Sequence, residues 1–264
     1  MFVLEGVGKT FANGFVALRD LHLRIAPGER VALLGPSGAG KTTLLRLLNA
    51  TLRPTAGRLT IAGLDSRHLH GKRLRQVRRT IGTIYQQYNL VPRLRVVHNV
   101  LAGHLGRWSG WRAALSLLHP LQLDTAVAAL QHVGLADRLW QRTDQLSGGE
   151  QQRVAIARVL VQDPAVILAD EPVASLDPGL AEGIVRLLVD LAVQRQKTLV
   201  VSLHHVPLAR AYFPRLLALQ QGRLVYDGPP QGLSAAAWQA LFAEAPLPAA
   251  AERAHVRPVT AFPL

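Results

Sequence analysis

The sequence has no cysteine among its 264 residues, which excludes disulfide bonds and thiolate metal sites. It also lacks an apolar stretch long enough to cross a bilayer: the most apolar region, around Val154–Leu168, is interrupted by Arg158, Asp163 and Pro164. The opening residues MFVLEGVGKTF do not have the basic and apolar regions of a secretory signal peptide. We therefore expect a protein that folds in the cytoplasm.

Acidic residues are scarce. The chain has 17 Asp and Glu against 30 Lys and Arg, so its formal net charge is +13. Such a balance favours a polyanionic partner, which could be a nucleotide, a nucleic acid or an anionic membrane surface. Charge alone does not choose among these. The densest basic cluster, Arg67 to Arg79, is interpreted as a solvated helix or loop face.

The pattern of apolar residues predicts an α/β fold. The first part of the chain reads as strands, with Leu21, Leu23 and Ile25 alternating with polar residues. A short apolar run, Arg30–Leu34, suits a buried strand and is followed by a glycine-rich loop and a helical pattern over Lys41–Asn49. The chain is long enough for one large domain, or for a core with a subdomain.

From about residue 88 to 145 the strand signals disappear and helical periodicity dominates, which indicates a helical insertion. After it the pattern alternates between helix and strand. The expected elements are helix Glu150–Gln162, strand Ala165–Ala169, helix Leu180–Gln194 and strand Thr198–Leu203. This alternation predicts a parallel sheet with crossover helices. The Ala- and Pro-rich segment 243–264 is expected to be a flexible tail.

The glycine-rich loop is a phosphate-binding motif. Residues 35–42, GPSGAGKT, fit the pattern G-x-x-x-x-G-K-[ST], with an apolar strand before and a helix after. Its glycines let backbone N–H groups converge on phosphate oxygens, and the helix N-terminus adds the positive end of its dipole. Lys41 would reach the β and γ phosphates, and the Thr42 hydroxyl would ligate Mg²⁺. The motif is shared by all P-loop NTPases and does not name a reaction.

Two carboxylates end a buried strand. The run Val166–Ala169 is followed directly by Asp170 and Glu171. A carboxylate in that position is costly unless a charge faces it, and Mg²⁺ would supply that charge for Asp170. Glu171, one residue further, could polarise an attacking water as a general base. A strand that simply ends in a polar turn is the alternative, and the P-loop makes the catalytic interpretation preferable.

A second anion-binding motif lies in residues 146–151, LSGGEQ. Ser147, Gly148 and Gly149 open a helix, whose N-terminus favours negative charge. One ATP needs only one phosphate cradle. A second cradle in the same chain suggests a nucleotide held between two copies of the protein.

On these motifs the sequence resembles the ATP-binding-cassette ATPases, over about residues 2 to 230. The resemblance implies an ATPase whose catalytic residues are Glu171, His204, Gln86 and Lys41, with Mg²⁺ held by Thr42, Gln86 and Asp170. It implies that ATP contacts Phe11, Gly35, Pro36, Ser37, Gly38, Ala39, Gly40, Lys41, Thr42, Thr43 and, across a dimer, Ser147, Gly148, Gly149 and Asp177. The last belongs to the sequence Ser175-Leu-Asp177, which matches the family's interface loop.

Three of these assignments have a close rival in the sequence. Gln87 follows Gln86, His205 follows His204, and Phe15 lies near Phe11. The family pattern favours the first member of each pair, but strand alternation does not separate the neighbouring glutamines or histidines. An isolated aromatic such as Phe11 is more often a core residue than a ligand.

Within the family, the helical insertion is most similar to that of phosphonate importers. The matching segments include QQYNLVPRL from residue 86, LGRW from 105, VGLAD from 133 and QRTDQLSGG from 141. One departure is the sequence Val97-His98-Asn99, where an acidic residue usually precedes the asparagine. It puts the membrane-facing contact of that loop in doubt.

The resemblance implies a P-loop NTPase core with a mostly parallel sheet, an N-terminal antiparallel β subdomain and an inserted helical subdomain. The ATPase domain would span residues 1–242, with the core and β subdomain in 1–87 and 150–230 and the helical signature subdomain in 88–149.

The implied assembly is a homodimer of ATPase subunits on the cytoplasmic face of a bacterial inner membrane, where it would bind transmembrane permease subunits. A periplasmic binding protein would take part indirectly, and the cargo would be a phosphonate or a related reduced-phosphorus anion such as phosphite or hypophosphite. The alternatives are an ATPase of this family for another cargo, a nucleic-acid-associated ATPase or a non-transport regulator. The absence of a long coiled coil, zinc-ligand cysteines and a second cassette speaks against nucleic acid as a partner, and Glu171 speaks against a switch without hydrolysis.

Overall fold

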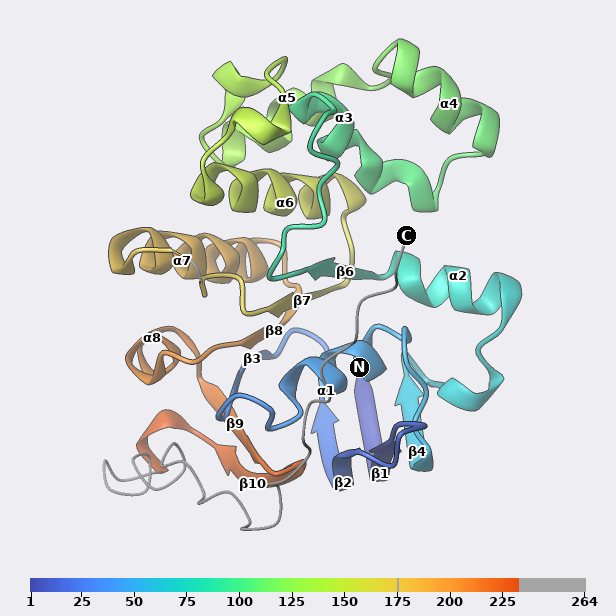
Figure 1. Ribbon diagram of the computed structural model, residues 1–264, viewed down its shortest axis with the longest axis vertical. Helices are drawn as coiled ribbons and strands as arrows, with labels where there is room; N and C mark the ends of the chain where they lie inside the picture. Colours follow the sequence, from blue (N-terminus) through green and yellow to red (C-terminus); the bar gives the residue numbers. More distant parts are fainter. Residues whose placement is uncertain (175, 233–264) are drawn as a thin grey trace, which may run out of the picture.

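The computed structural model describes residues 1–174 and 176–232, so the predicted tail 243–264 and the end of the predicted ATPase domain lie outside the described residues. Its first sheet is antiparallel, with strand order β2-β1-β4-β5 (Figure 1). The strands are β1 (Phe2–Thr10), β2 (Val16–Ile25), β4 (Ala56–Ile61) and β5 (Leu64–Asp65). This is the N-terminal antiparallel sheet that was predicted.

The second sheet has the strand order β10-β9-β3-β8-β7-β6. All neighbours are parallel except β9 and β10, which are antiparallel. The strands are β3 (Arg30–Leu34), β6 (Ile81–Ile84), β7 (Val166–Asp170), β8 (Thr198–Ser202), β9 (Arg215–Gln220) and β10 (Arg223–Gly228). The predicted fold class, with a mostly parallel core sheet, is confirmed. Because β6, β7, β8 and β3 are parallel, the loops that follow them leave the sheet at the same edge.

The helices of the segment between β6 and β7 gather at one end of the molecule (Figure 1). They are α3 (Val96–Leu101), α4 (Gly110–Leu118), α5 (Leu123–His132) and α6 (Gly148–Gln162), with short 3₁₀ turns at Ala102–Gly106 (η2), Ala136–Arg138 (η3) and Thr143–Gln145 (η4). The others are α1 (Lys41–Leu48), α2 (Gly71–Arg79), α7 (Pro178–Gln194) and α8 (Val206–Tyr212), with 3₁₀ turns at Ser66–His68 (η1) and Pro230–Gly232 (η5).

Membrane-spanning length is not reached by any single helix in the described residues. The pair α4 and α5 reaches the required length and apolarity only together, and the two helices are bent by 73° relative to each other.

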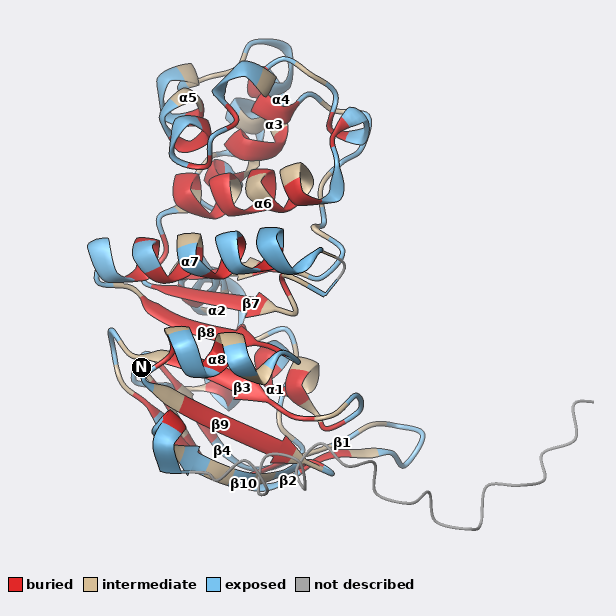
Figure 2. Ribbon diagram, turned by 90° about the vertical axis from the view of Figure 1, so that its left-hand side faces the viewer, coloured by how far each residue is buried: buried red, intermediate tan, exposed pale blue. Residues whose placement is uncertain are grey.

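The parallel sheet separates two hydrophobic cores, and β3 contributes to both. Ala32 and Leu34 pack with α6 and α7, whereas Val31 and Leu33 pack with α1 and the antiparallel sheet. All four side chains are fully buried, and the buried strands form the centre of the molecule (Figure 2). A strand buried on both faces reads as a continuous apolar run, which explains the sequence of Arg30–Leu34.

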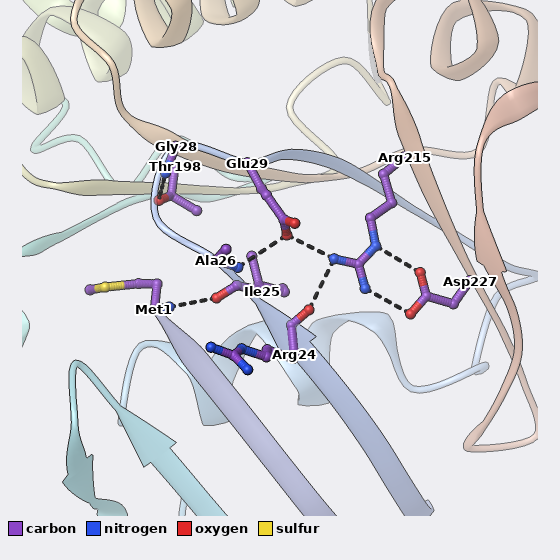
Figure 3. A network of polar contacts seen from close by, with 9 residues as sticks. All are labelled: Met1, Arg24, Ile25, Ala26, Gly28, Glu29, Thr198, Arg215 and Asp227. Atoms are coloured by element: carbon purple, nitrogen blue, oxygen red, sulfur yellow. Dashed lines mark hydrogen bonds and ion pairs between the residues drawn. The ribbon is translucent and has the colours of Figure 1, made fainter.

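A polar network fixes the chain just before β3 (Figure 3). The Arg215 guanidinium on β9 donates to both carboxylate oxygens of Asp227, at 2.7 Å each, and to Glu29 at 2.7 Å. It also donates to the backbone carbonyl of Arg24 at 2.9 Å. These hydrogen bonds to Asp227, with the charges of Asp227 and Glu29, raise the pKa of Arg215 although its burial opposes them. The network thereby ties the end of β2 and the start of β3 to β9 and β10.

Candidate active site

The P-loop joins β3 to α1, and close packing requires two of its glycines, Gly35 and Gly40. Gly35 has φ of 149°, and a Cβ there would lie 2.3 Å from the Leu219 carbonyl oxygen. Gly40 has φ of 105°, and its Cβ would lie 2.6 Å from the Ala17 carbonyl oxygen. No larger residue fits either position without moving backbone. The antiparallel sheet and β9 therefore hold the loop in shape from both sides.

Lys41 begins α1, and its side chain curls back over the P-loop. The residue is only 4% exposed, and its ammonium donates to the carbonyls of Gly35 at 2.8 Å and Pro36 at 3.1 Å. It also lies 3.7 Å from Oε1 of Glu171. Burial lowers the pKa of Lys41, while the carboxylates of Glu171 and Asp170 oppose that shift. The positive charge is thus concentrated within the loop, where an anion would meet it.

Asp170 is brought to the P-loop by strand order. Strand β8 lies between β3 and β7, and Asp170 pairs with Ser202 at the ends of β7 and β8. The Asp170 carboxylate accepts hydrogen bonds from Ser202 at 2.8 Å and from the Thr42 hydroxyl at 3.2 Å. Residues 128 positions apart are therefore in direct contact at one edge of the sheet.

Of the three predicted metal ligands, Thr42, Gln86 and Asp170, the described contacts bring together only Thr42 and Asp170. Hydroxyl and carboxylate oxygens are the donors that Mg²⁺ prefers, so Thr42 and Asp170 fit that ion. Within residues 1–174 and 176–232 no group of three His, Asp or Glu side chains could hold a metal, so the remaining ligands would have to be phosphate oxygens, water or Gln86.

Glu171 has an unusual backbone conformation. Its φ is 47°, in the left-handed region that a non-glycine residue adopts at a cost of about 1 kcal/mol or more. Its N–H donates to the Ser202 hydroxyl at 2.8 Å, which helps to hold that conformation. The carboxylate is hydrogen-bonded to Nε2 of His204, and both residues line a cavity of about 340 Å³. Backbone strain of this kind is concentrated at functional sites.

The neighbouring histidines have different surroundings. The His204 ring contacts Glu171 and is 39% exposed. The Nδ1 of His205 instead accepts a hydrogen bond from the Leu208 N–H at 3.2 Å and caps the N-terminus of α8. Strand alternation in the sequence did not separate these two histidines. In the structure it is His204 that contacts the Glu171 carboxylate, whereas His205 caps a helix.

Gln86 and Gln87 lie in the turn after β6, at the same sheet edge, and both are exposed. Neither side chain makes a hydrogen bond within residues 1–174 and 176–232, so the described contacts do not choose between them. The turn is held from the other side by Arg158 of α6, which donates to the carbonyls of Tyr88, at 3.0 Å, and Asn89. Burial lowers the pKa of Arg158.

The LSGGEQ motif forms the N-terminus of α6. Ser147 is the N-cap and makes a capping box with Glu150: its hydroxyl accepts from the Glu150 N–H at 3.3 Å, and its own N–H donates to the Glu150 carboxylate at 2.9 Å. Hydrogen bonding from Ser147 lowers the pKa of Glu150. A Cβ at Gly148 would lie 3.0 Å from the Tyr88 hydroxyl, so a larger residue here would require the Tyr88 side chain to shift. The motif makes no side-chain hydrogen bond or ion pair with the P-loop in the described residues.

A buried asparagine connects the segment after Gln86 to the segment before Ser147. Asn99, on α3, is 3% exposed and bonds both the N–H and the carbonyl of Val91, at 2.7 and 3.0 Å. Its amide also donates to the Thr143 hydroxyl at 2.9 Å, and that hydroxyl donates to the Leu94 carbonyl at 3.0 Å. We call these contacts the Asn99 clip. It fixes the relative positions of residues 91–94 and 143.

The sequence interpretation missed Arg158, Ser202 and the Asn99 clip as parts of the site. Ser202 had a detectable signal, since it is a polar residue in the otherwise apolar strand β8. Arg158 is a charged residue on a helix with many buried apolar residues. The pairing of Asn99 with Thr143 has no local signal, because the two residues are 44 positions apart.

The predicted ligands Asp177 and Phe11 are not joined to these carboxylates by hydrogen bonds in the described residues. Asp177 caps α7 by accepting from the Leu180 N–H at 3.0 Å, and its neighbour Ser175 lies outside the described residues. The Phe11 ring stacks on Phe15, with 6.4 Å between ring centroids, at the exposed turn between β1 and β2.

Residues 18–174 match the family described as ABC transporter. The chain is 49% identical to the phosphonates import ATP-binding protein PhnC 1 of Pseudomonas aeruginosa, over 93% of this chain and 92% of that protein. It is 42% identical to the protein of the same name from Rhodopseudomonas palustris, over 92% and 90%.

Among solved structures, the chain is similar to the dimeric post-hydrolysis state of the ATP-binding cassette MJ0796 bound to ADP and Pi. The TM-score is 0.76 and the identity 34%, over 88% of this chain and all of the other. It is also similar to cbiO1 from Clostridium perfringens, described as part of the ABC transporter complex cbiONQ, with a TM-score of 0.75 and 28% identity over 87% and 88%.

Proposed function

We propose that this chain, which belongs to the ABC transporter family, is the ATP-hydrolysing subunit of an importer for phosphonates or related reduced-phosphorus anions. The observation that carries the ATPase chemistry is the contact chain at one sheet edge, from Thr42 through Asp170 and Ser202 to Glu171 and His204. The cargo rests on the phosphonate-import names of relatives that match nearly the whole chain.

The substrate would be ATP, with its β and γ phosphates over the P-loop. The backbone N–H groups of the loop and the Lys41 ammonium would face the phosphate oxygens. Lys41 already lies within the loop and near the carboxylates, so little side-chain rearrangement would be needed to meet an anion. Thr42 and Asp170 would hold Mg²⁺, which when bound neutralises part of the phosphate charge.

Glu171 would act as general base toward the attacking water, and His204 would orient its carboxylate. Two contacts support this assignment: the Ser202 hydroxyl fixes the Glu171 N–H, and the His204 ring fixes the carboxylate. A carboxylate whose backbone and side chain are both held presents one geometry to the water, which is the condition for efficient proton abstraction. Gln86, in the adjacent turn, would sense the water and the metal.

The N-terminus of α6 would contact the γ-phosphate of a nucleotide bound to a second copy of the chain. Within the described residues Ser147, Gly148 and Gly149 make no hydrogen bond or ion pair with their own P-loop, and the α6 N-terminus carries a positive dipole end. Asp177 would lie at the same subunit interface, and Phe11 would stack on adenine. Hydrolysis would remove the γ-phosphate and with it the bridge between subunits.

The proposed assembly contains two copies of this chain bound to permease subunits at the cytoplasmic face of the inner membrane, with a periplasmic binding protein delivering the cargo. The segment from Gln86 to Ser147 would transmit the nucleotide cycle to the permease, since the Asn99 clip and Arg158 make it continuous with α6.

Cargo and chemistry are tested together by reconstitution with the permease in liposomes, with the binding protein outside. We expect methylphosphonate to stimulate ATP hydrolysis and to accumulate inside, and both effects to be lost in Glu171→Gln. ATP hydrolysis that responds to a different solute would leave the ATPase assignment intact and overturn the phosphonate assignment. Uptake that persists at the parental rate in Glu171→Gln would overturn the assignment of the base.

A further inference from the structure

One long stretch of the sequence carries charge of a single sign. Between Asp65 and Asp124 the sequence contains no Asp or Glu but ten Lys and Arg residues. This stretch runs from the end of the antiparallel sheet through α2, β6, α3 and η2 to α4. Part of this charge, the Arg67–Arg79 cluster, fits a solvated helix. The structure adds a cleft that this helix and a distant basic residue line together.

Four arginines of this stretch meet at a cleft of about 200 Å³ between α2 and η2. Arg75, Arg78 and Arg79 come from α2, and Arg107 follows η2. The other lining residues are Ala102, Gly103, Gly106 and Gln162, so no carboxylate lines the cleft. The two elements approach closely, because a Cβ on Gly106 would lie 3.3 Å from Cγ of Arg79.

The arginines in the cleft differ in whether their guanidinium groups have hydrogen-bond partners. Arg78 donates to the Ala50 carbonyl at 3.0 Å, and Arg107 donates to the Gln162 carbonyl at 2.8 Å. Arg75 and Arg79 make no side-chain hydrogen bond or ion pair within the described part of the chain. Arg107 acts on Asp163 only through its charge, and Asp163 is ion-paired with Lys197 at 2.9 Å.

Helix electrostatics explains only part of this arrangement. Arg78 and Arg79 lie in the last turn of α2, where the dipole favours positive charge. That effect does not reach Arg107, which comes from another element and adds a fourth like charge to the same cleft. Like charges gathered in this way repel one another, so an anion in the cleft would lower the free energy of the folded state.

We propose that this arginine cleft binds a tetrahedral oxyanion of the phosphate class. A guanidinium presents a planar fork of N–H donors that matches phosphate oxygens in pairs, which a lysine ammonium does not. Two arginines without partners and two anchored on backbone carbonyls form such a cradle. The bound anion would bridge α2 to the helical segment that carries the Asn99 clip. The free anion and a phospholipid headgroup share this chemistry.

The test is a calorimetric titration of the full chain with inorganic phosphate, with the P-loop saturated by MgADP. The cleft variant is Arg75→Gln with Arg79→Gln. Both side chains are exposed and lack described partners, so we expect the fold and the ADP affinity to be unchanged. The control is Arg210→Gln with Arg223→Gln, which removes the same charge from exposed positions on α8 and β10.

We expect phosphate to bind the parent and the control equally and the cleft variant about tenfold or more weakly, because charge-assisted hydrogen bonds are the strong ones. Equal phosphate affinity in all three proteins would overturn the proposal.

A second measurement distinguishes the sources of the anion. The three proteins are sedimented with vesicles of phosphatidylglycerol or of phosphatidylcholine alone. Arginine-dependent binding to phosphatidylglycerol vesicles alone would assign the cleft to a lipid headgroup, and phosphate binding without vesicle binding would assign it to a free oxyanion. The proposal is wrong if none of the three proteins binds phosphate or phosphatidylglycerol vesicles. If the cleft variant then loses only its association with the permease, the arginines pair with protein carboxylates instead. None of these outcomes depends on the identity of the cargo.

Discussion

The two halves of the proposed nucleotide site differ in how their side chains are held. On the P-loop side, Lys41, Asp170 and Glu171 are buried or half-buried: Ser202 bonds both Asp170 and Glu171, and Lys41 lies 3.7 Å from Glu171. These contacts come from three parallel strands, β3, β7 and β8, and the loops that follow them. On the α6 side, Ser147 is exposed, and within the described residues its hydroxyl hydrogen-bonds only to Glu150 of the same helix. The first half is preorganised within one chain, whereas the second is a helix N-terminus presented outward. This difference indicates a site completed by a second copy.

The largest effect is expected for Glu171→Gln, which removes the base but keeps the size of the side chain. ATP hydrolysis should fall about 10²- to 10⁴-fold, the range that general base catalysis contributes, while ATP binding is retained. Single-turnover hydrolysis and equilibrium ATP binding measure the two separately. Glu182→Gln is the matched control, because Glu182 lines the same cavity from α7. A rate loss as large in the control would remove the special role of Glu171.

Ser202→Ala tests whether the P-loop half depends on its internal contacts. The substitution removes the fully buried Ser202 hydroxyl, which donates to the Asp170 carboxylate and accepts from the Glu171 N–H. The free energy of unfolding should therefore fall by about 1–3 kcal/mol. ATP hydrolysis should fall with it. Urea unfolding and ATPase assays measure both. Ser109→Ala is the control, since Ser109 is exposed and its side chain caps nothing, and an equal loss there would contradict the account.

Thr143→Val tests the Asn99 clip, which belongs to the α6 half. It replaces the hydroxyl that accepts from Asn99 and donates to the Leu94 carbonyl, so unfolding should become easier by about 1–2 kcal/mol. ATP hydrolysis in the assembled transporter should fall while the KM for ATP is unchanged. Thr143→Ser keeps the hydroxyl and should behave as the parent. If Thr143→Ser loses as much activity as Thr143→Val, the hydroxyl contacts are not the cause.

The smallest effect is expected for the capping box. The pKa of Glu150 is below its usual value of 4.5, chiefly because the Ser147 N–H is bonded to the carboxylate. A lowered native pKa means that the stabilisation is present above 4.5 and is lost as the pH falls through the native pKa. Because the Glu150 side chain is 29% exposed to solvent, screening limits this to on the order of 0.5 kcal/mol. Glu150→Gln should keep the cap and lose this pH dependence. Parallel acid-unfolding curves for parent and variant would contradict this.

The sequence predicted the P-loop half well because its signals are local. Each signal spans fewer than ten consecutive residues: the glycine-rich loop, the apolar strand before it and the acidic end of β7. The structure has strands at Arg30–Leu34 and Val166–Asp170, where these signals predicted them. Helices α6 and α7 begin two residues before the predicted starts. Their caps, Ser147 and Asp177, belong to motifs that were interpreted through ligand contacts rather than through helix capping.

The contacts that join these elements were not predicted. Ser202 meets Asp170 only because β8 lies between β3 and β7, and strand order is not encoded in periodicity. The arginine cleft likewise needs Arg107 to lie beside α2, although the sequence separates them by nearly thirty residues. Charge counting identified the excess of Lys and Arg but not the place where four of them meet.

Sedimentation velocity of Glu171→Gln, with and without MgATP, tests the comparison most directly. If Ser147 of one copy completes the P-loop of the other, MgATP should convert the variant from monomer to dimer, and adding Ser147→Arg should abolish that conversion while ATP binding remains. A Glu171→Gln protein that is saturated with MgATP and stays monomeric, or a dimer that tolerates Ser147→Arg, would contradict the shared site.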